Sequence, residues 1–401
     1  MSAQVADRAP ERELPAARAE QLPAASGAWR EGDPVGWKRF ADLGDLPLQL
    51  GGVLPRVVLA YETWGTLAED GSNAVLVEHA LTGDAHVLGE AGAGQPTAGW
   101  WGELVGPGRP LDTERWFVVA ANVLGGCQGS TGPASRRPGS SVPWGSRFPR
   151  ITVADQVAAE VRLADELGIA RFAAVLGGSM GGMRSLEWAA AQPDRVGAAL
   201  VLATCAASTA DQIGTQSTQL SAILADPGWH GGDYHDLPRG QGPHGGLGLA
   251  RRLAHLSYRT AAELDIRFGR SPQPGEDPSA PSAPGRYAVQ SYLDHHATKL
   301  VRRFDAGSYV ALTDALNTWD VGTGRGGTDA ALAAITVPLV VAAVDSDRLY
   351  PVADSVRIVE HAPAAVDGLR LVASESGHDG FLLEADQIAP LVTETLELGS
   401  R

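Results

Sequence analysis

A glycine-flanked serine between an apolar run and a helical run constrains this chain more than any other feature. The apolar run Phe172–Leu176 is followed by Gly177–Gly181, of sequence GGSMG, and then by the helical stretch Met183–Ala191. A turn from strand to helix at such a segment is so tight that side chains two residues from the serine would clash. The oxygen of Ser179 would then stand at a helix N-terminus, where free N–H groups favour developing negative charge. A glycine-rich loop with a buried serine would show the same five letters, so the flanking elements are what favour a nucleophile.

Apolar, β-branched runs alternate with helical stretches from about residue 46 onward. Nearly continuous apolar runs are typical of strands that are buried on both faces of a parallel sheet. A helix is predicted over 151–167, because its valines recur at helical spacing and Gly168 supplies a stop. This alternation predicts an α/β fold with a mostly parallel, doubly wound sheet. The predicted strands are Val57–Thr63, Ala74–Glu78, Trp116–Ala121, Phe172–Leu176, Ala198–Ala203, Leu339–Val344 and Leu369–Val372.

The alternation stops between residues 208 and 335, where helical stretches are separated by loops rich in Gly and Pro at 227–246 and 271–285. We interpret 208–335 as a helical lid insertion in a core formed by 30–207 and 336–401. Residues 1–29 are rich in Ala, Glu, Arg and Pro, and we expect a flexible leader there, with a short exposed helix as the alternative. The helices predicted in the lid are Gln212–Leu224, Gly248–Glu263 and Ala288–Ala311.

The charge and cysteine content narrow the function classes. The 401 residues carry a formal net charge of −15, which disfavours nucleic acid and anionic membranes as partners. No run is long enough to span a membrane, and Cys127 and Cys205 are too few for a disulfide framework, so we expect a cytoplasmic protein. His230, His235 and His244 lie in a glycine-rich loop without a carboxylate–histidine helix motif, and we predict no metal site.

Partners for the serine follow two later predicted strands. Asp345 and Asp347 come directly after one strand, and His378 comes just after the last one. In an α/β hydrolase the triad runs serine, acid, histidine along the chain. His378 would take the proton of Ser179, and a carboxylate would orient the imidazole. Spacing alone does not separate Asp345 from Asp347, and a loop histidine bonded to the backbone is the alternative for His378.

An oxyanion hole needs two backbone N–H donors. The first should be that of Met180, directly after the nucleophile, and the second should come from the loop after an early strand. In this chain that loop follows Ala74–Glu78, and Leu81 is the candidate.

At these residues the sequence resembles the homoserine O-acetyltransferase family, whose members have the α/β-hydrolase fold. The resemblance covers nearly the whole chain after the leader, and a generic hydrolase would not need the second or the fourth of the matching segments. These segments are 78–83 (EHALTG), 122–133 (NVLGGCQGSTGP), 177–183 (GGSMGGM), 347–351 (DRLYP) and 377–381 (GHDGF).

The resemblance implies that the chain moves an acetyl group from acetyl-CoA to the hydroxyl of L-homoserine in methionine biosynthesis. The route would be ping-pong through an acyl ester on Ser179, with acetyl-CoA as co-substrate and no cofactor. The family's acid directly precedes the Arg-Leu-Tyr-Pro-like run, which implies Asp347. Substrate recognition would fall to Arg251, Tyr258 and Asp379, since a guanidinium can hold the substrate carboxylate and a carboxylate its ammonium. The family also implies a homodimer formed through the lid helices.

Several alternatives stay open on the sequence. Succinyl-CoA could be the donor, or L-serine the acceptor, since one methylene is worth only about 1–3 kcal/mol in discrimination. Ester or thioester hydrolysis needs the same triad, and an inactive binding protein of this fold is a third class. Arg251 could instead form a salt bridge within the lid. We expect the adjacent Arg252 to be a surface or structural residue. CoA is a polyanion, so a CoA site needs a local cluster of Arg or Lys that the net charge does not reveal.

Overall fold

An eight-stranded sheet forms the centre of the computed structural model, which describes residues 22–401. The strand order is β1-β4-β8-β5-β9-β10-β11-β12, with antiparallel pairing only at β1–β4 and β4–β8. The predicted mostly parallel sheet is therefore confirmed, and each predicted strand has a counterpart. The strands are β1 (Arg39–Asp42), β4 (Val58–Trp64), β5 (Ala74–Glu78), β8 (Phe117–Ala121), β9 (Phe172–Gly178), β10 (Val196–Leu202), β11 (Leu339–Val344) and β12 (Ala365–Val372).

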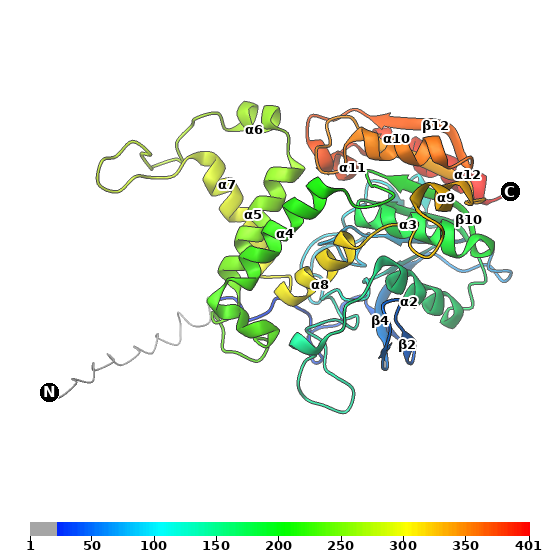
Figure 1. The fold of residues 1–401 in the computed structure, drawn as a ribbon, viewed down its shortest axis with the longest axis horizontal. Coiled ribbons are helices and arrows are strands. Elements are labelled where there is room, and N and C mark those ends of the chain that lie inside the picture. Colours follow the sequence, from blue (N-terminus) through cyan, green and yellow to red (C-terminus); the bar gives the residue numbers. More distant parts are fainter. Residues whose placement is uncertain (1–21) are drawn as a thin grey trace.

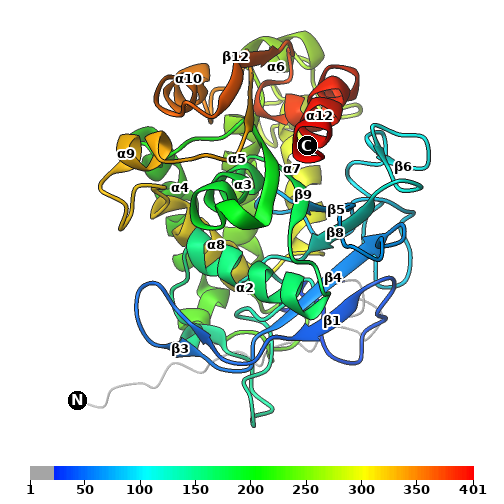
Figure 2. The ribbon, with the colours of Figure 1, turned by 90° about the vertical axis from the view of Figure 1, so that its right-hand side faces the viewer.

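Helices cover both faces of the sheet (Figures 1 and 2). Successive residues of β11 belong to two separate apolar clusters: Val341 packs in one, and Val340 and Ala342 pack in the other. The first cluster includes side chains of α2 (Val153–Glu166), α3 (Met180–Ala191) and α10 (Val352–His361), and the second includes those of α12 (Ala385–Gly399). This is the doubly wound arrangement that the alternation predicts. Short pairs β2 (Leu46–Pro47) with β3 (Val53–Leu54) and β6 (Val105–Gly106) with β7 (Leu111–Asp112), and turns η1 (Gly145–Arg147) and η2 (Pro193–Arg195), lie outside the sheet.

Helices fill the chain between β10 and β11, and Figure 1 shows α4, α5 and α7 gathered to one side of the sheet. We call residues 208–335 the lid segment. Its elements are α4 (Ala210–Leu224), η3 (Pro227–Gly232), α5 (His244–Tyr258), α6 (Ala261–Arg267), α7 (Ala288–Val301), α8 (Ala306–Asn317) and α9 (Thr328–Ala333).

Two predicted lid helices are wrong in extent, because each is two helices. The side chain of Thr260 accepts a hydrogen bond from Glu263 N–H and caps α6, which separates it from α5. Asp305 caps α8 in the same way through Ser308 N–H, which separates α8 from α7. The predicted stretches 248–263 and 288–311 therefore each contain a helix start.

The chain before β1 differs from the leader that the sequence suggests. Residues 1–21 of that leader lie outside the described residues. Residues 22–29 pack on the lid segment: Ser26 Oγ donates to Asp305 Oδ1 at 2.7 Å, and Gly27 N–H donates to Phe304 O at 3.2 Å. Ala25 and Ala28 are buried, so this part behaves as part of the fold.

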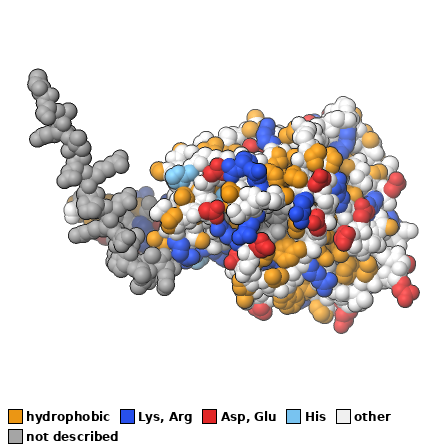
Figure 3. Space-filling model, turned by 90° about the horizontal axis from the view of Figure 1, so that it is seen from below, with side chains coloured by type: hydrophobic (Ala, Val, Ile, Leu, Met, Phe, Trp, Pro, Cys, Tyr) orange, Lys and Arg blue, Asp and Glu red, His pale blue; other side chains and the backbone are white. Residues whose placement is uncertain are grey.

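The surface is mixed in charge. On the face shown in Figure 3, Lys and Arg side chains are interspersed with Asp, Glu and apolar ones. Within residues 22–401, no helix combines the length and the apolar character that a membrane crossing requires.

Candidate active site

The turn between β9 and α3 holds Ser179 in a strained backbone conformation, with φ 59° and ψ −124°. A Cβ on Gly177 would lie 2.3 Å from the backbone of Gly181, and one on Gly181 would lie 2.1 Å from Glu78 O. Only glycine fits at these two positions, as the sequence argument requires. Such backbone strain at a serine between a strand and a helix is typical of a functional turn.

The structure brings Ser179, His378 and Asp347 into one hydrogen-bonded chain. His378 Nε2 lies 2.9 Å from Ser179 Oγ, and His378 Nδ1 lies 2.6 Å from Asp347 Oδ2. The other oxygen of Asp347 accepts hydrogen bonds from Leu349 N–H at 2.8 Å and Tyr350 N–H at 2.9 Å. All three side chains are buried. These are the contacts that a nucleophile, a base and an orienting acid need.

Asp345, the competitor on spacing, faces elsewhere. Its Oδ1 accepts a hydrogen bond from Ser374 N–H at 3.0 Å. Asp347 is therefore the carboxylate in contact with the imidazole, as the family resemblance implies.

The electrostatic environment of His378 is set by two opposing effects. Burial lowers the pKa of its imidazole, but the carboxylates of Asp347 and Asp379 more than reverse this, and the net pKa is raised. The imidazolium that forms when the serine loses its proton is therefore stabilised in the site.

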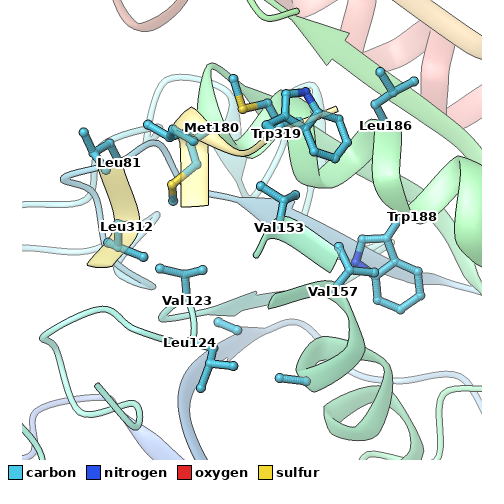
Figure 4. Packing of buried hydrophobic residues seen from close by; sticks show 14 of the residues in the cluster. Leu81, Val123, Leu124, Val153, Val157, Met180, Leu186, Trp188, Leu312 and Trp319 are labelled. Carbon is cyan, nitrogen blue, oxygen red and sulfur yellow. The ribbon is translucent and has the colours of Figure 1, made fainter. Parts of the chain in front are cut away.

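The two predicted oxyanion donors have backbone N–H groups that are not engaged elsewhere in the described residues. Within residues 22–401, neither Leu81 N–H nor Met180 N–H donates to a protein acceptor, and both side chains belong to one buried cluster (Figure 4). The loop before Leu81 is held firmly: Arg184 Nη2 donates to His79 O at 2.5 Å, and Val123 N–H donates to His79 Nε2 at 3.1 Å. An oxyanion hole requires two such fixed, free N–H groups, and that of Met180 directly follows the serine.

The three predicted substrate residues lie beside the hydrogen-bonded triad of Ser179, His378 and Asp347. Arg251 Nη1 lies 3.4 Å from Thr82 Oγ1, and its guanidinium carbon lies 5.6 Å from the centre of the Tyr258 ring. The Tyr258 and His378 rings are 5.7 Å apart between centroids. Asp379 is the next residue after His378 and has a partner that the sequence did not reveal, because its Oδ2 lies 3.0 Å from Arg259 Nη2.

A cavity of about 250 Å³ lies against Arg251 and Asp379. Sequence reasoning singled out Arg251 and Asp379 but missed the other charged groups around the cavity. Arg252, one position along α5, turns away and lies 3.3 Å from Asp294. The lining residues are Thr97, Arg251, His255, Arg259, His296, Lys299, Leu300, Arg303, Asp379, Leu382 and Leu383. A larger cavity, of about 500 Å³, lies near Trp29 and Arg136 and is lined by none of the predicted site residues.

Two of the three histidines of the glycine-rich loop, His235 and His244, have separate partners. His235 Nε2 lies 3.1 Å from Asp305 Oδ1, and His244 Nε2 lies 2.7 Å from Ala24 O. In the part of the chain that the structure describes, no group of three or more His, Cys, Asp or Glu side chains could hold a metal ion.

Known proteins match this fold and sequence closely. The model of the α/β-hydrolase fold family matches residues 73–385. A homoserine O-acetyltransferase of Thermobifida fusca (strain YX) is 61% identical over 373 residues, which cover 93% of this chain and 97% of that protein. The crystal structure of a homoserine O-acetyltransferase from Bacillus anthracis has a TM-score of 0.79 at 25% identity and covers 90% of this chain and 97% of that one. An acetylester hydrolase from Corynebacterium glutamicum has a TM-score of 0.74 at 27% identity, over 90% of this chain and 96% of that one. With 61% identity over nearly the full length of the first of these, the chain belongs to the homoserine O-acetyltransferase family of the α/β-hydrolase fold.

Proposed function

We propose that this chain transfers the acetyl group of acetyl-CoA to the hydroxyl of L-homoserine through an ester on Ser179. The observation that carries the proposal is the chain of contacts from Ser179 through His378 to Asp347, with Arg251 and Asp379 beside it, in a member of this family. The products would be O-acetyl-L-homoserine and CoA, a step of methionine biosynthesis.

In the first half-reaction, Ser179 Oγ attacks the thioester carbonyl while His378 Nε2 accepts its proton. Asp347 stabilises the imidazolium through the short contact to Nδ1. The N–H groups of Leu81 and Met180 would hold the negative oxygen of the tetrahedral intermediate. The imidazolium then returns its proton to the thiolate of CoA, which leaves, and the acetyl group stays on the serine.

In the second half-reaction, His378 takes the proton of the homoserine hydroxyl, whose oxygen attacks the acetyl carbonyl. The bond from the acetyl carbon to Ser179 Oγ then breaks, and the imidazolium of His378 returns its proton to Ser179 Oγ. Arg251 would hold the substrate carboxylate as a fork, with the Tyr258 ring beside it. Asp379 would attract the ammonium group, and Arg259 fixes that carboxylate in place. None of these steps needs a cofactor or a metal ion.

Hydrolysis is the second candidate, and a specific observation favours it. The solved neighbour at 27% identity is named an acetylester hydrolase, so proteins of this shape include hydrolases. The same triad would serve, with water in place of homoserine as the attacking group.

The test follows free thiol after purified protein is mixed with acetyl-CoA and L-homoserine. Parallel reactions omit homoserine, replace it with L-serine, or replace acetyl-CoA with succinyl-CoA, and Ser179→Ala is the blank. We expect thiol release that needs both acetyl-CoA and homoserine and is absent from the blank. Release at the same rate without an acceptor would make the protein a thioesterase, and release with another donor or acceptor would reassign the substrate.

The proposal includes a homodimer in the cytoplasm, with contacts through the lid helices, as the family implies. Light scattering on the purified full chain tests the dimer, and a monomeric mass at assay concentration would contradict it.

A further inference from the structure

Positive charge gathers around the cavity of about 250 Å³ beside the candidate active site. Arg251 and Arg259 come from α5 and the residue after it, Lys299 comes from α7, and Arg303 lies just beyond α7. Asp379 is the single carboxylate in the lining. In a chain with a formal net charge of −15, four cations around one small cavity form a local reversal of charge.

Several nitrogen donors around this cavity have no partner. Arg251 Nε, Arg259 Nε, Arg303 Nε and His255 Nε2 are buried and have no hydrogen-bond partner within residues 22–401. A buried donor without an acceptor is costly, so their concentration in the lining of one cavity indicates a ligand that supplies acceptor oxygens.

The cations of the cavity are close enough to His296 to affect the pKa of its imidazole. Burial lowers the pKa of His296 to about 4, and Arg251, Arg259 and Lys299 contribute to the lowering. The imidazole is therefore neutral near pH 7, and the positive charge of the cavity comes from the arginines and the lysine. Arg259 is partly neutralised, since it pairs with Asp379 at 3.0 Å and with Glu263 at 3.0 Å.

Two of the lining arginines contact the candidate oxyanion loop, while the lining lysine lies at the surface. Arg303 Nη1 donates to Thr82 O at 2.9 Å, and Arg251 contacts the Thr82 hydroxyl, one residue after Leu81. Lys299, by contrast, is exposed on α7. A ligand in this cavity would therefore meet Arg303 on the side of the candidate site and Lys299 on the side of the solvent.

The acceptor alone does not account for this many cations. A zwitterionic amino acid has one carboxylate, for which the fork of Arg251 is sufficient. Lys299 and Arg303 then have no role in acceptor binding, whereas a CoA thioester carries several phosphate charges. Lysine and arginine are the usual partners of phosphate.

We propose that Lys299 and Arg303 bind the phosphate groups of the acyl donor and so select a CoA thioester over a donor without phosphates. This inference rests on the proposed function, because it names the groups that recognise its donor. The order of a ping-pong reaction allows the donor to leave this cavity before the acceptor's carboxylate reaches Arg251.

The test compares acetyl-CoA with S-acetylpantetheine, which has the same thioester and lacks the phosphates. Lys299→Gln is the informative variant, since Lys299 is exposed while Arg303 also supports the loop at Thr82. We expect kcat/KM for acetyl-CoA to fall about tenfold, as for loss of one charge-assisted hydrogen bond. The values for S-acetylpantetheine and for homoserine should stay within about twofold of the parent. Arg302→Gln, at an exposed arginine outside the cavity lining, is the matched control. It should leave kcat/KM unchanged for acetyl-CoA and for S-acetylpantetheine.

Other outcomes separate the two proposals. An equal loss with both donors, or a loss confined to homoserine, would overturn the phosphate assignment while acetyl transfer itself stands. If the parent transfers no acetyl group to homoserine, the proposed function fails. In that case, calorimetric titration of Ser179→Ala with CoA and with pantetheine still tests whether the cavity binds phosphate groups. Tighter binding of CoA that Lys299→Gln removes would support the assignment, and equal binding of the two would overturn it.

Discussion

At the scale of single residues, the groups that set the pKa of His378 predict how activity depends on pH. The neutral imidazole is the base, so activity should fall as the pH drops through its pKa, which Asp347 and Asp379 raise against the effect of burial. Asp347→Asn removes the larger of these carboxylate effects and leaves the burial. We expect kcat to fall by about 10³–10⁴-fold, and the acid limb of the residual kcat/KM profile to move to lower pH. Rates of acetyl transfer from acetyl-CoA between pH 5 and pH 9 measure both the fall in kcat and the position of the acid limb.

The same profile for Asp345→Asn is the control, because Asp345 bonds Ser374 N–H and not the histidine. An acid limb that stays in place in Asp347→Asn would show that another group sets the pH dependence.

The triad could be predicted residue by residue because the fold fixes its order along the chain. The choice between Asp345 and Asp347 needed the family resemblance, and the structure shows why spacing was not enough. The two carboxylates are two residues apart on one loop, but one faces the imidazole and the other faces a backbone N–H. The pair of Arg259 with Asp379 could not be predicted, because it joins distant parts of the chain and depends on where α5 ends.

At the scale of elements, the turn between β9 and α3 predicts which glycines are indispensable. A Cβ at position 181 would lie 2.1 Å from Glu78 O, so Gly181→Ala must push α3 away from β5. We expect a loss of about 1–3 kcal/mol or more in the free energy of unfolding and a fall in kcat. Gly214→Ala in α4 is the matched control, since a Cβ there has no atom within 4 Å. It should stabilise the protein by about 0.5–1 kcal/mol.

Urea unfolding and acetyl transfer by both variants check this prediction. Gly181→Ala with parental stability and activity would mean that the turn tolerates a Cβ, and that the steric account of the glycines is wrong.

A buried arginine joins the elements beneath the candidate site. Arg184 of α3 lies 2.5 Å from Glu78 of β5 and 2.6 Å from Glu160 of α2, and it also bonds His79 O. Arg184→Met leaves the two carboxylates buried without their cation, so we expect a loss of about 3–5 kcal/mol in stability. Arg171→Met, at an exposed arginine, should change stability by less than about 0.5 kcal/mol. Thermal and urea unfolding measure the difference, and equal effects of the two variants would contradict it.

The helix boundaries in the lid show how far local sequence patterns reach. Both missed breaks carry a capping residue three positions before its partner, at Thr260 with Glu263 and at Asp305 with Ser308. The first of these has the Thr-x-x-Glu pattern of a helix start, so this break is predictable from the sequence. Strand β1 gave no such signal, because its burial pattern leaves only Ala41 inside.

At the scale of the whole molecule, one buried carboxylate joins segments that are far apart in the sequence. Asp305 accepts hydrogen bonds from Ser26 Oγ at 2.7 Å, from Tyr234 Oη at 2.6 Å and from Ser308 N–H at 2.7 Å. His235 Nε2 lies 3.1 Å away. The segment before β1, the glycine-rich loop and α8 are thus held at one point. The sequence showed neither the packing of residues 22–29 nor this junction, because composition describes a segment and not its partners.

This junction predicts how stability depends on pH. Burial alone would raise the pKa of Asp305, but His235, Tyr234 and Ser26 reverse this and hold it well below its ordinary value. A carboxyl whose pKa is depressed by folding stabilises the protein above its unfolded pKa of about 4, and this stabilisation is lost as the pH falls further. Asp305→Asn cannot ionise, so it should be about 2–3 kcal/mol less stable than the parent at pH 7. The difference in the free energy of unfolding between the parent and Asp305→Asn should narrow between pH 5 and pH 3. Urea unfolding across this range measures the difference, with Asp194→Asn, at an exposed aspartate, as the control. Parallel curves of stability against pH for the parent and Asp305→Asn would show that Asp305 does not cause the acid sensitivity.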